Sequence, residues 1–324
     1  MRRSGEPRAG RTRTDAAGRS ALSGFRARAF GLHWASDVAL PHFADDPQAD
    51  AAVDIRVERI EALSAREPLQ TINRGAVFGD GFRLADDGIA AFEMSGGTHI
   101  GYVPGARWSG ALPLRFYSTA VALTCAWRGA IPMHASAVAI DGRAWLLCGA
   151  TGAGKSTLTA ALLAQGADFI GDDLTVLDAD GGSATVPRGR TTMRLHPDTA
   201  RWTPATSAAP DTRDQRGKWL VEPLSPEGER WPLAGFVLVG AEQDAADRAR
   251  LKARVAREMF RPRWLEALPG HPDRVAGLFS AAAGVPILAL PNVEIGGESD
   301  FHELGARTMN SVRVAIAQTI NRPG

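Results

Sequence analysis

The stretch LLCGATGAGKSTLTAALLAQGADFIGDDLTVLD, residues 146–178, decides the fold of this 324-residue chain. Within it, Gly149–Ser156 fits the pattern G-x-x-x-x-G-K-[ST] of a phosphate-binding loop, or P-loop. Loops of this kind serve nucleotide hydrolysis as well as phosphoryl transfer to a small molecule or to a protein. The loop therefore predicts that phosphates bind here, and the residues around it have to distinguish between these reactions.

The segments on either side of the loop follow the order that a P-loop needs. Trp145–Cys148 is a short apolar run typical of a buried strand, and Ser156–Gln165 contains no helix breaker and ends at Gly166. Glycines let the backbone N–H groups of the loop turn inward, and the N-terminus of the following helix favours anions. We therefore expect ATP and Mg²⁺ to bind through nine consecutive residues: Gly149, Ala150, Thr151, Gly152, Ala153, Gly154, Lys155, Ser156 and Thr157.

Lys155 and Ser156 have separate predicted tasks in this loop. The lysine ammonium reaches the β- and γ-phosphates, and the serine hydroxyl binds Mg²⁺. The chain contains only three lysines, at positions 155, 218 and 252, and has a large excess of arginine. A lysine that is kept at this position indicates that the site needs an ammonium group. The same argument draws attention to Lys218, although an exposed surface lysine is the simpler interpretation there.

Length and composition set further limits. A chain of 324 residues can bury a large core in one or two domains, and a formal net charge of +1 favours neither nucleic acid nor a membrane as partner. Cys125 and Cys148 lack metal-ligand spacing, so we expect two buried thiols, as suits the reducing cytoplasm. No apolar run reaches transmembrane length.

Three parts follow one another along the chain. Residues 1–24 are rich in Arg, Gly and Ser, and we expect a disordered basic tail. Residues 25–129 show short strand-like runs between Asp-, Gly- and Pro-rich turns, with a helix over Leu114–Trp127, and predict a β-rich N-terminal domain. Residues 130–324 alternate strands with helices and predict a P-loop α/β catalytic domain, which makes the whole chain α+β. Within this part, Pro204–Gly217 has few apolar residues and is expected to be a mobile loop.

A histidine is predicted to lie at the mouth of the loop. Met133–Ile140 is expected to form a strand, and Asp141-Gly142 after it is a strong signal for a two-residue hairpin. In the register that this turn sets, His134 lies opposite Gly149. At that place the imidazole either reaches the γ-phosphate region or only caps backbone groups at the end of the strand.

Two adjacent carboxylates follow the next predicted strand. Ala167–Gly171 comes directly after the helix and is followed by Asp172 and Asp173. In a parallel α/β unit this end of the strand lies beside the P-loop. Successive side chains of an extended chain point in opposite directions, so the two aspartates are expected to face different partners. The pair either takes part in the chemistry or forms a polar turn.

His134, the loop and Gly-Asp-Asp at 171–173 together resemble the catalytic domain of HPr kinase/phosphorylase. The spacing is similar too: Lys155 lies 21 positions after His134, and Asp172 lies 17 positions after Lys155. The resemblance is specific for residues 133–178 and loose elsewhere. It implies a P-loop HPr-kinase-like fold in which Asp172 is the general base on the acceptor serine, His134 lies beside it at the site of transfer, and Asp173 joins Ser156 in supporting Mg²⁺.

One segment departs from the pattern of the bifunctional enzymes. In those enzymes an acidic stretch follows the Asp pair, whereas Pro187–Leu195 is basic here. The layout is more similar to stand-alone HPr-kinase-like proteins, some of which phosphorylate the C-terminal serine of a lasso precursor peptide. This implies a peptide or small protein as acceptor, and the resemblance also suggests a homo-oligomer. Arg188, Arg190 and Arg194 are candidates to bind an acidic group or the C-terminal carboxylate of the acceptor, although each alone is also typical of a protein surface.

Other functions remain open at this stage. An HPr-type metabolic protein kinase or a small-molecule kinase would use the same core. A P-loop ATPase or GTPase switch places an acidic residue after a later apolar strand, and Phe236–Glu242 can be interpreted in that way. That segment lacks a strand-terminal Asp, however, and the chain has no Asn-Lys-x-Asp motif for reading a base. The Asp pair close behind Lys155 therefore favours an ATP-dependent serine kinase.

Overall fold

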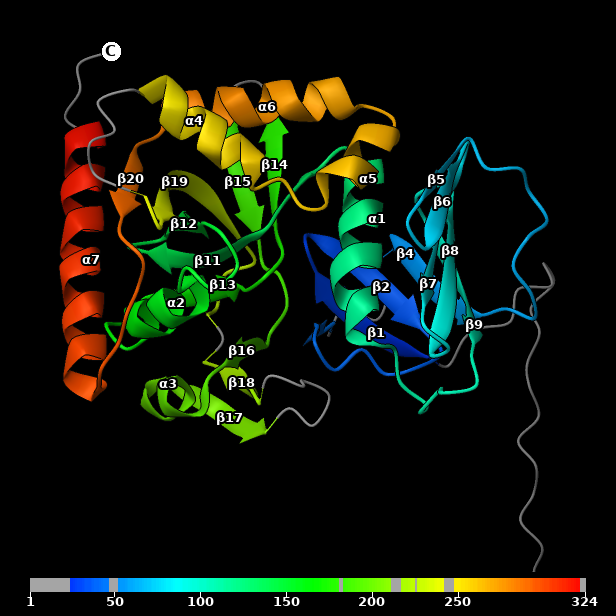
Figure 1. The fold of residues 1–324 in the computed structure, drawn as a ribbon, viewed down its shortest axis with the longest axis horizontal. Coiled ribbons are helices and arrows are strands. Elements are labelled where there is room, and N and C mark those ends of the chain that lie inside the picture. Colours follow the sequence, from blue (N-terminus) through cyan, green and yellow to red (C-terminus); the bar gives the residue numbers. More distant parts are fainter. Residues whose placement is uncertain are drawn as a thin grey trace, which may run out of the picture.

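The structure is a computed structural model that describes residues 24–46, 52–180, 183–210, 217–224, 226–241 and 248–320. The predicted basic tail lies outside these ranges except for Gly24. The described residues form an α/β fold with two large sheets and a small third one (Figure 1). The strands of the N-terminal part, coloured blue to cyan, lie on one side of the molecule, and the P-loop region lies on the other.

The N-terminal sheet has nine strands in the order β3-β1-β2-β4-β9-β8-β7-β6-β5. Its strands alternate between buried apolar and more exposed polar side chains, as in β4, where Ile55 and Val57 are buried and Arg56 and Glu58 are not. The run of strands predicted for this part is therefore confirmed. The strands are β1 (Phe25–Ala29), β2 (Leu32–Ser36), β3 (Ala44–Asp45), β4 (Ile55–Arg59), β5 (Gln70–Ile72), β6 (Gly75–Phe78), β7 (Gly81–Asp86), β8 (Ala90–Ser95) and β9 (His99–Pro104).

The second sheet carries the P-loop. Its strand order is β10-β14-β15-β19-β12-β11-β13, and β20 joins through β19. Strand β11 pairs antiparallel with β12 on one side and with β13 on the other, so β12 and β13 run in the same direction and end at the same edge of the sheet. The strands are β10 (Ile131–Met133), β11 (Ala135–Ile140), β12 (Arg143–Cys148), β13 (Asp168–Gly171), β14 (Thr175–Asp180), β15 (Ser183–Pro187), β19 (Arg230–Val239) and β20 (Ile287–Leu290).

Helices cover both faces of this second sheet. Helix α2 packs on β11, β12 and β13 and is flanked by α7, whereas α4 and α6 pack on the side of β19, β14 and β15 (Figure 1). A π-helix, η1 (Phe116–Ala120), leads directly into α1, so the helix predicted to close the N-terminal part is present. The α-helices are α1 (Val121–Trp127), α2 (Lys155–Leu163), α3 (Pro197–Trp202), α4 (Arg248–Arg257), α5 (Pro262–Ala267), α6 (His271–Gly284) and α7 (Glu298–Ile320).

The loop predicted over Pro204–Gly217 is in part a strand. β17 (Ala205–Pro210) pairs antiparallel with β18 (Trp219–Pro223), which in turn pairs with β16 (Met193–Leu195). Most side chains of β17 are exposed, so its low apolar content is compatible with a strand that is held by backbone pairing. The prediction of a loop was wrong for these residues, and residues 211–216 lie outside the described ranges.

The main hydrophobic core continues from the N-terminal sheet into the second sheet. It joins side chains such as Phe82 and Ile100 to Ile131, Phe236 and Leu278 in one cluster of buried residues. Helix α5 contributes to this connection, because a Cβ atom added at Gly75 would lie 2.5 Å from the indole ring of Trp264. The division into domains near residue 129 stays a prediction. Among the helices of the described ranges, none combines the length and the apolar composition that crossing a bilayer requires.

Candidate active site

The P-loop has the geometry that its sequence predicts. β12 ends at Cys148, the loop follows, and α2 begins at Lys155. Two glycines are required by the local geometry. A side chain at Gly149 would meet the backbone oxygen of Val239 at 2.4 Å, and Gly154 has a φ of +98° with Val293 2.4 Å from the position of a Cβ atom. The order of strand, loop and helix is therefore confirmed, and the N-terminus of α2 opens towards the loop.

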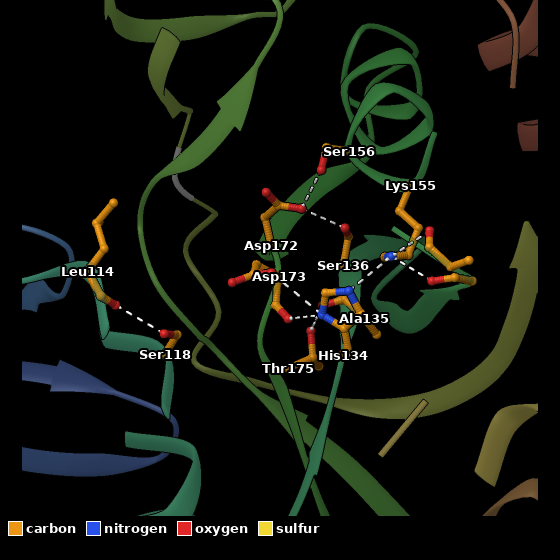
Figure 2. A network of polar contacts seen from close by, with 12 residues as sticks. Leu114, Ser118, His134, Ala135, Ser136, Lys155, Ser156, Asp172, Asp173 and Thr175 are labelled. Atoms are coloured by element: carbon orange, nitrogen blue, oxygen red, sulfur yellow. Dashed lines mark hydrogen bonds and ion pairs between the residues drawn. The ribbon is translucent and has the colours of Figure 1, made fainter. Parts of the chain in front are cut away.

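Lys155 is held tightly within the loop. Only 8% of its surface is exposed. Its Nζ donates hydrogen bonds to the backbone oxygens of Gly149 at 2.6 Å and Ala150 at 3.3 Å, and lies 3.4 Å from Nε2 of His134 (Figure 2). The ammonium group therefore lies at the centre of the loop, within reach of the histidine that the hairpin brings towards it.

The hairpin register that places His134 is confirmed. Ala135 pairs with Cys148 and Ile140 with Arg143, so His134 comes one residue before the paired strand, at the mouth of the loop. The predicted strand over Met133–Ile140 is interrupted at His134, because β10 pairs with β14 while β11 pairs with β12 and β13. This interruption leaves the backbone N–H of His134 to donate to the carbonyl oxygen of Glu258 at 2.6 Å.

The contacts of its imidazole define the tautomer of His134. Nδ1 lies 3.1 Å from the carbonyl oxygen of Asp173, which can only accept, so Nδ1 carries the proton. Nε2 faces the ammonium of Lys155, which can only donate, so Nε2 offers its lone pair. These two contacts are those expected of the Nδ1–H tautomer, with Nε2 directed at Lys155.

One carboxylate oxygen of Asp172 accepts hydrogen bonds from two hydroxyl groups. Ser136 donates to Oδ1 at 2.6 Å and Ser156 donates to the same atom at 2.9 Å (Figure 2). Asp172 is buried, with 4% of its surface exposed, yet it lines the cavity in front of the loop. Within the described residues no hydrogen bond or ion pair engages Oδ2, so this oxygen can accept a proton from a group in the cavity.

Asp173 faces different partners. Its backbone has a φ of +69°, a left-handed conformation that turns the chain immediately after Asp172. Its Oδ1 lies 3.5 Å from Nδ1 of His134, and its Oδ2 lies 3.9 Å from the guanidinium of Arg190. The two aspartates thus diverge as expected, although a turn of the backbone separates them and not an extended strand.

In the described residues, no hydrogen bond joins the two predicted metal ligands, Ser156 and Asp173, although both line the same cavity. Asp172 is the carboxylate that contacts Ser156, and the assignment of Asp173 to the metal stays a prediction. No cluster of three or more His, Cys, Asp or Glu side chains suited to a metal ion occurs in the described part of the chain. Mg²⁺ that travels with a nucleotide needs only one or two protein oxygens besides phosphates and water. Since the Ser156 hydroxyl donates its hydrogen bond to Asp172, the lone pairs of its oxygen remain for a cation, and the residues present fit such an ion.

The three candidate arginines lie in three different environments. Arg188 donates to the backbone oxygens of Pro226 and Gly228 and does not line the cavity. Arg190 is buried and donates to the carbonyl oxygen of Asp172 at 2.9 Å. Burial lowers the pKa of its guanidinium, and the nearby Asp173 and Asp172 act to raise it. Arg194 alone lines the cavity.

A cavity of about 740 Å³ lies in front of the P-loop, within the usual range of ligand sites. The predicted residues His134, Lys155, Ser156, Asp172 and Asp173 all line it. The lining also includes residues that sequence reasoning did not assign to the site: Ser118, His196, Lys218, Arg257, Glu258, Met259, Phe260, Arg261, Pro262 and Val293.

Sequence reasoning also missed Ser136. It has a local signal, because it is the only hydroxyl residue in β11, a strand whose side chains are all buried. A buried hydroxyl next to a predicted active site needs a partner, and the Asp pair offered one. The residues from Arg257 to Arg261 have no comparable signal, since they are brought to the site only by the way α4 ends against the strand that leads into His134.

Comparisons with known proteins show a limited similarity. No protein-family model matches the chain. No curated protein matches it either. Among solved structures, the chain is similar to the Hpr(Ser) kinase/phosphatase from Coxiella burnetii, with 16% sequence identity and a TM-score of 0.21. The similar region covers 33% of this chain and 63% of that protein, so the chain spans less than two thirds of the length of this neighbour.

Proposed function

We propose that this protein is an ATP-dependent serine kinase of the HPr-kinase-like type. It transfers the γ-phosphoryl group of ATP to a serine hydroxyl of a peptide or small protein, and its specific acceptor is the C-terminal serine of a lasso precursor peptide. One observation carries the proposal. A buried carboxylate, Asp172, accepts a hydrogen bond from the P-loop serine and lines the same cavity as the P-loop lysine.

Each residue of the site has a task in this reaction. Lys155 and the N-terminus of α2 bind the phosphates and offset their charge. Asp172 accepts the proton of the acceptor serine at Oδ2 as the new P–O bond forms and the bond to the β-phosphate breaks. His134 lies next to Lys155 and offers a second proton acceptor at Nε2. Mg²⁺, held in part by Ser156, neutralises charge on the phosphate oxygens when the nucleotide is bound.

Transfer is tested with ATP, Mg²⁺ and two acceptors. One acceptor is a synthetic lasso precursor peptide that ends in serine, and the other is HPr. We expect the peptide to gain ~80 Da per phosphate, the mass of the group transferred in this class of reaction, with fragmentation placing the group on the last serine. Efficient labelling of HPr without labelling of the peptide would make the protein an HPr-type metabolic kinase. ATP hydrolysis at the same rate without any acceptor would favour a P-loop ATPase.

The role of Asp172 is tested with Asp172→Asn. This variant keeps the shape of the side chain and removes its proton affinity, so ATP should bind as before while phosphoryl transfer slows ~10²–10⁴-fold. Asp141→Asn is a matched control, since Asp141 is exposed at the far end of the same hairpin and pairs with Arg313. If Asp172→Asn instead loses nucleotide binding and transfers normally per bound ATP, Asp172 is a binding residue.

A further inference from the structure

The wall of the cavity between helices α4 and α5 carries two arginines, and we call residues 257–261 the α4–α5 turn. Arg257 is the last residue of α4, and Arg261 directly precedes α5. Both line the cavity that contains Lys155 and Asp172. Both are exposed, and within the described ranges neither guanidinium pairs with a carboxylate. The guanidinium carbon of Arg261 lies 5.7 Å from the centroid of the Phe260 ring, in the manner of a cation–π contact.

The backbone of this turn is fixed to the strand that positions His134. The N–H of Phe260 donates to the carbonyl oxygen of Pro132 at 2.9 Å, and the N–H of His134 donates to that of Glu258 at 2.6 Å. Met133 and Met259 face each other as an isolated antiparallel bridge between these two bonds. The turn is therefore hydrogen-bonded on both sides of Met133, which fixes the backbone that carries Arg257 and Arg261 relative to the backbone of His134.

The conformation of Arg261 adds a second observation. Its φ of +51° and ψ of +59° are left-handed, a region that a residue with a long side chain rarely adopts. The N–H groups of Trp264 and Leu265 hold this conformation by donating to the carbonyl oxygen of Arg261. Non-glycine residues in such conformations gather at binding and catalytic sites, where the surrounding structure holds them in place. The arginine is thus held in the cavity wall against its own backbone preference.

The charge of the cavity calls for an anion in addition to the nucleotide. Lys155 and the start of α2 already serve the phosphates. The lining contains further basic residues on other elements, Arg194, His196 and Lys218, whereas its acidic residues are Asp172, Asp173 and Glu258. Both guanidinium groups line the same cavity, and an anion bound between them would offset their mutual repulsion. A planar carboxylate fits this requirement, since it accepts paired hydrogen bonds from a guanidinium.

We infer that Arg257 and Arg261 bind a carboxylate of the acceptor next to the serine that receives the phosphate. The inference rests on the proposed function and assigns the recognition of the acceptor to the α4–α5 turn, outside the basic segment Pro187–Leu195. In this arrangement Lys155 binds the phosphates of the nucleotide, and the α4–α5 turn binds the carboxylate of the acceptor. Asp172 lies in the same cavity, where it can reach the hydroxyl between them.

The experiment compares three synthetic peptides of the same sequence. The first ends in serine with a free carboxylate, the second ends in the amide of that serine, and the third is the amide with an aspartate directly before the serine. Each is tested with the full chain and with Arg257→Gln and Arg261→Asn. Asparagine is chosen at position 261 because it tolerates a positive φ, so the turn can be kept while the charge is removed. Arg263→Gln is the matched control, an exposed arginine of α5 that does not line the cavity.

The full chain should have a KM for the free acid ~10-fold or more below that for the plain amide, as expected for a charge-assisted hydrogen bond. Arg261→Asn and Arg257→Gln should each reduce this difference strongly, with the KM for ATP changed less than about twofold and Arg263→Gln like the parent. If the third peptide is as good as the free acid, the carboxylate is read from a side chain as well as from the C-terminus. If only the free acid is favoured, the turn reads the C-terminus.

Three outcomes would overturn the inference. The first is equal use of acid and amide by the full chain. The second is a rise in the KM for ATP in the arginine variants, which would assign them to the nucleotide. The third is an acid preference that survives in both variants. The same peptides, labelled with a fluorophore, are also measured by anisotropy without ATP. A preference for the acid in binding that the variants lose, together with no phosphorylation of any peptide, would support the inference and refute the proposed kinase activity.

Discussion

Nε2 of His134 lies 3.4 Å from Nζ of Lys155, and this contact joins the strand before the hairpin to the P-loop. Since Nδ1 of the same ring donates to the carbonyl oxygen of Asp173, the imidazole connects the lysine to the backbone of the Asp pair. The ring therefore holds three sequence-predicted residues in one arrangement.

Replacing the histidine tests whether this arrangement matters for transfer. His134→Asn keeps a donor near the carbonyl oxygen of Asp173 and removes the acceptor that faces Lys155. We expect phosphoryl transfer to slow ~10²-fold, within the range for loss of a group that handles protons at the site of reaction. Single-turnover measurements separate this from nucleotide binding. An unchanged rate would make His134 a structural residue. His99→Asn, in β9 of the N-terminal sheet and outside the cavity lining, is the control.

Lys155→Ala removes the charge that the P-loop directs at the phosphates. Activity should fall ~10³-fold or more, as is typical for the loss of a contact that stabilises charge in the transition state. Steady-state turnover with saturating ATP and binding of a fluorescent ATP analogue measure the two effects separately. Lys252→Ala, in helix α4 and outside the cavity lining, should behave like the parent. Near-normal turnover of Lys155→Ala would remove the basis for the P-loop assignment.

Ser136→Ala tests a residue that only the structure identifies. The variant removes one of the two hydroxyl donors to Oδ1 of Asp172 without a change in the strand. We expect kcat to fall ~10-fold, the effect of losing one hydrogen bond to a charged group, with the KM for ATP nearly unchanged. Ser136→Thr should restore part of the rate because it keeps the hydroxyl. If both variants equal the parent, Asp172 does not depend on Ser136 for its orientation.

Arg190 should be required for stability and for transfer. Its buried guanidinium donates to the carbonyl oxygen of Asp172 and lies 3.9 Å from the partly exposed carboxylate of Asp173, so Arg190→Met removes one of the two hydrogen bonds to that carbonyl oxygen and the cation beside Asp173. Unfolding in urea should show a loss of ~1.5–3 kcal/mol, the typical contribution of a hydrogen bond made by a charged group. Arg201→Met, an exposed arginine of α3, should change stability by less than ~0.5 kcal/mol. Equal stability of the two variants would contradict the role of Arg190 in holding the Asp pair.

The two thiols should be inert in the folded protein. Cys125 and Cys148 are free and buried, as the sequence predicted, and burial raises the pKa of each thiol above its ordinary value. Because the thiolate is the reactive form, a raised pKa lowers the reactive fraction at any pH below it. Iodoacetamide at pH 8 should therefore leave the native chain unmodified, and both cysteines should be alkylated in guanidinium chloride. Mass spectrometry counts the added groups. Rapid labelling of the native protein would show that one of these segments opens.

The sequence predicted the centre of the site because its signals are local. Asp141-Gly142 sets the hairpin register, and the P-loop pattern defines the order of strand, loop and helix on its own. The sequence predicted that the two aspartates face different partners, but it could not predict which partners these are. The contacts depend on the left-handed turn at Asp173 and on the positions of Ser136 and Arg190. These contacts exist only after distant segments have packed together.

The arginines show the same limit more strongly. The basic segment Pro187–Leu195 was predicted to bind the acceptor. In the structure, however, Arg188 donates to the backbone oxygen of Gly228, and Arg190 donates to the backbone oxygen of Asp172. The arginines of the α4–α5 turn lie about a hundred positions after Lys155, one at the end of a helix whose sequence is typical of a charged surface helix and the other just beyond that helix. Side-chain charge can be seen in a sequence, but the direction in which it points depends on tertiary structure.

The packing of Trp264 over Gly75 has a consequence for how this protein can change during evolution. Trp264 comes three residues after Arg261, and its indole packs against Gly75 of the N-terminal sheet. A larger residue at position 75 would also meet the backbone oxygen of Arg83. We therefore expect substitutions in β5 to β7 to act on α5 and on the cavity wall formed by the α4–α5 turn, without a change in the P-loop. Laboratory selection for a new acceptor should recover mutations there, far from the phosphates in sequence, and sequencing of the selected clones would show whether it does.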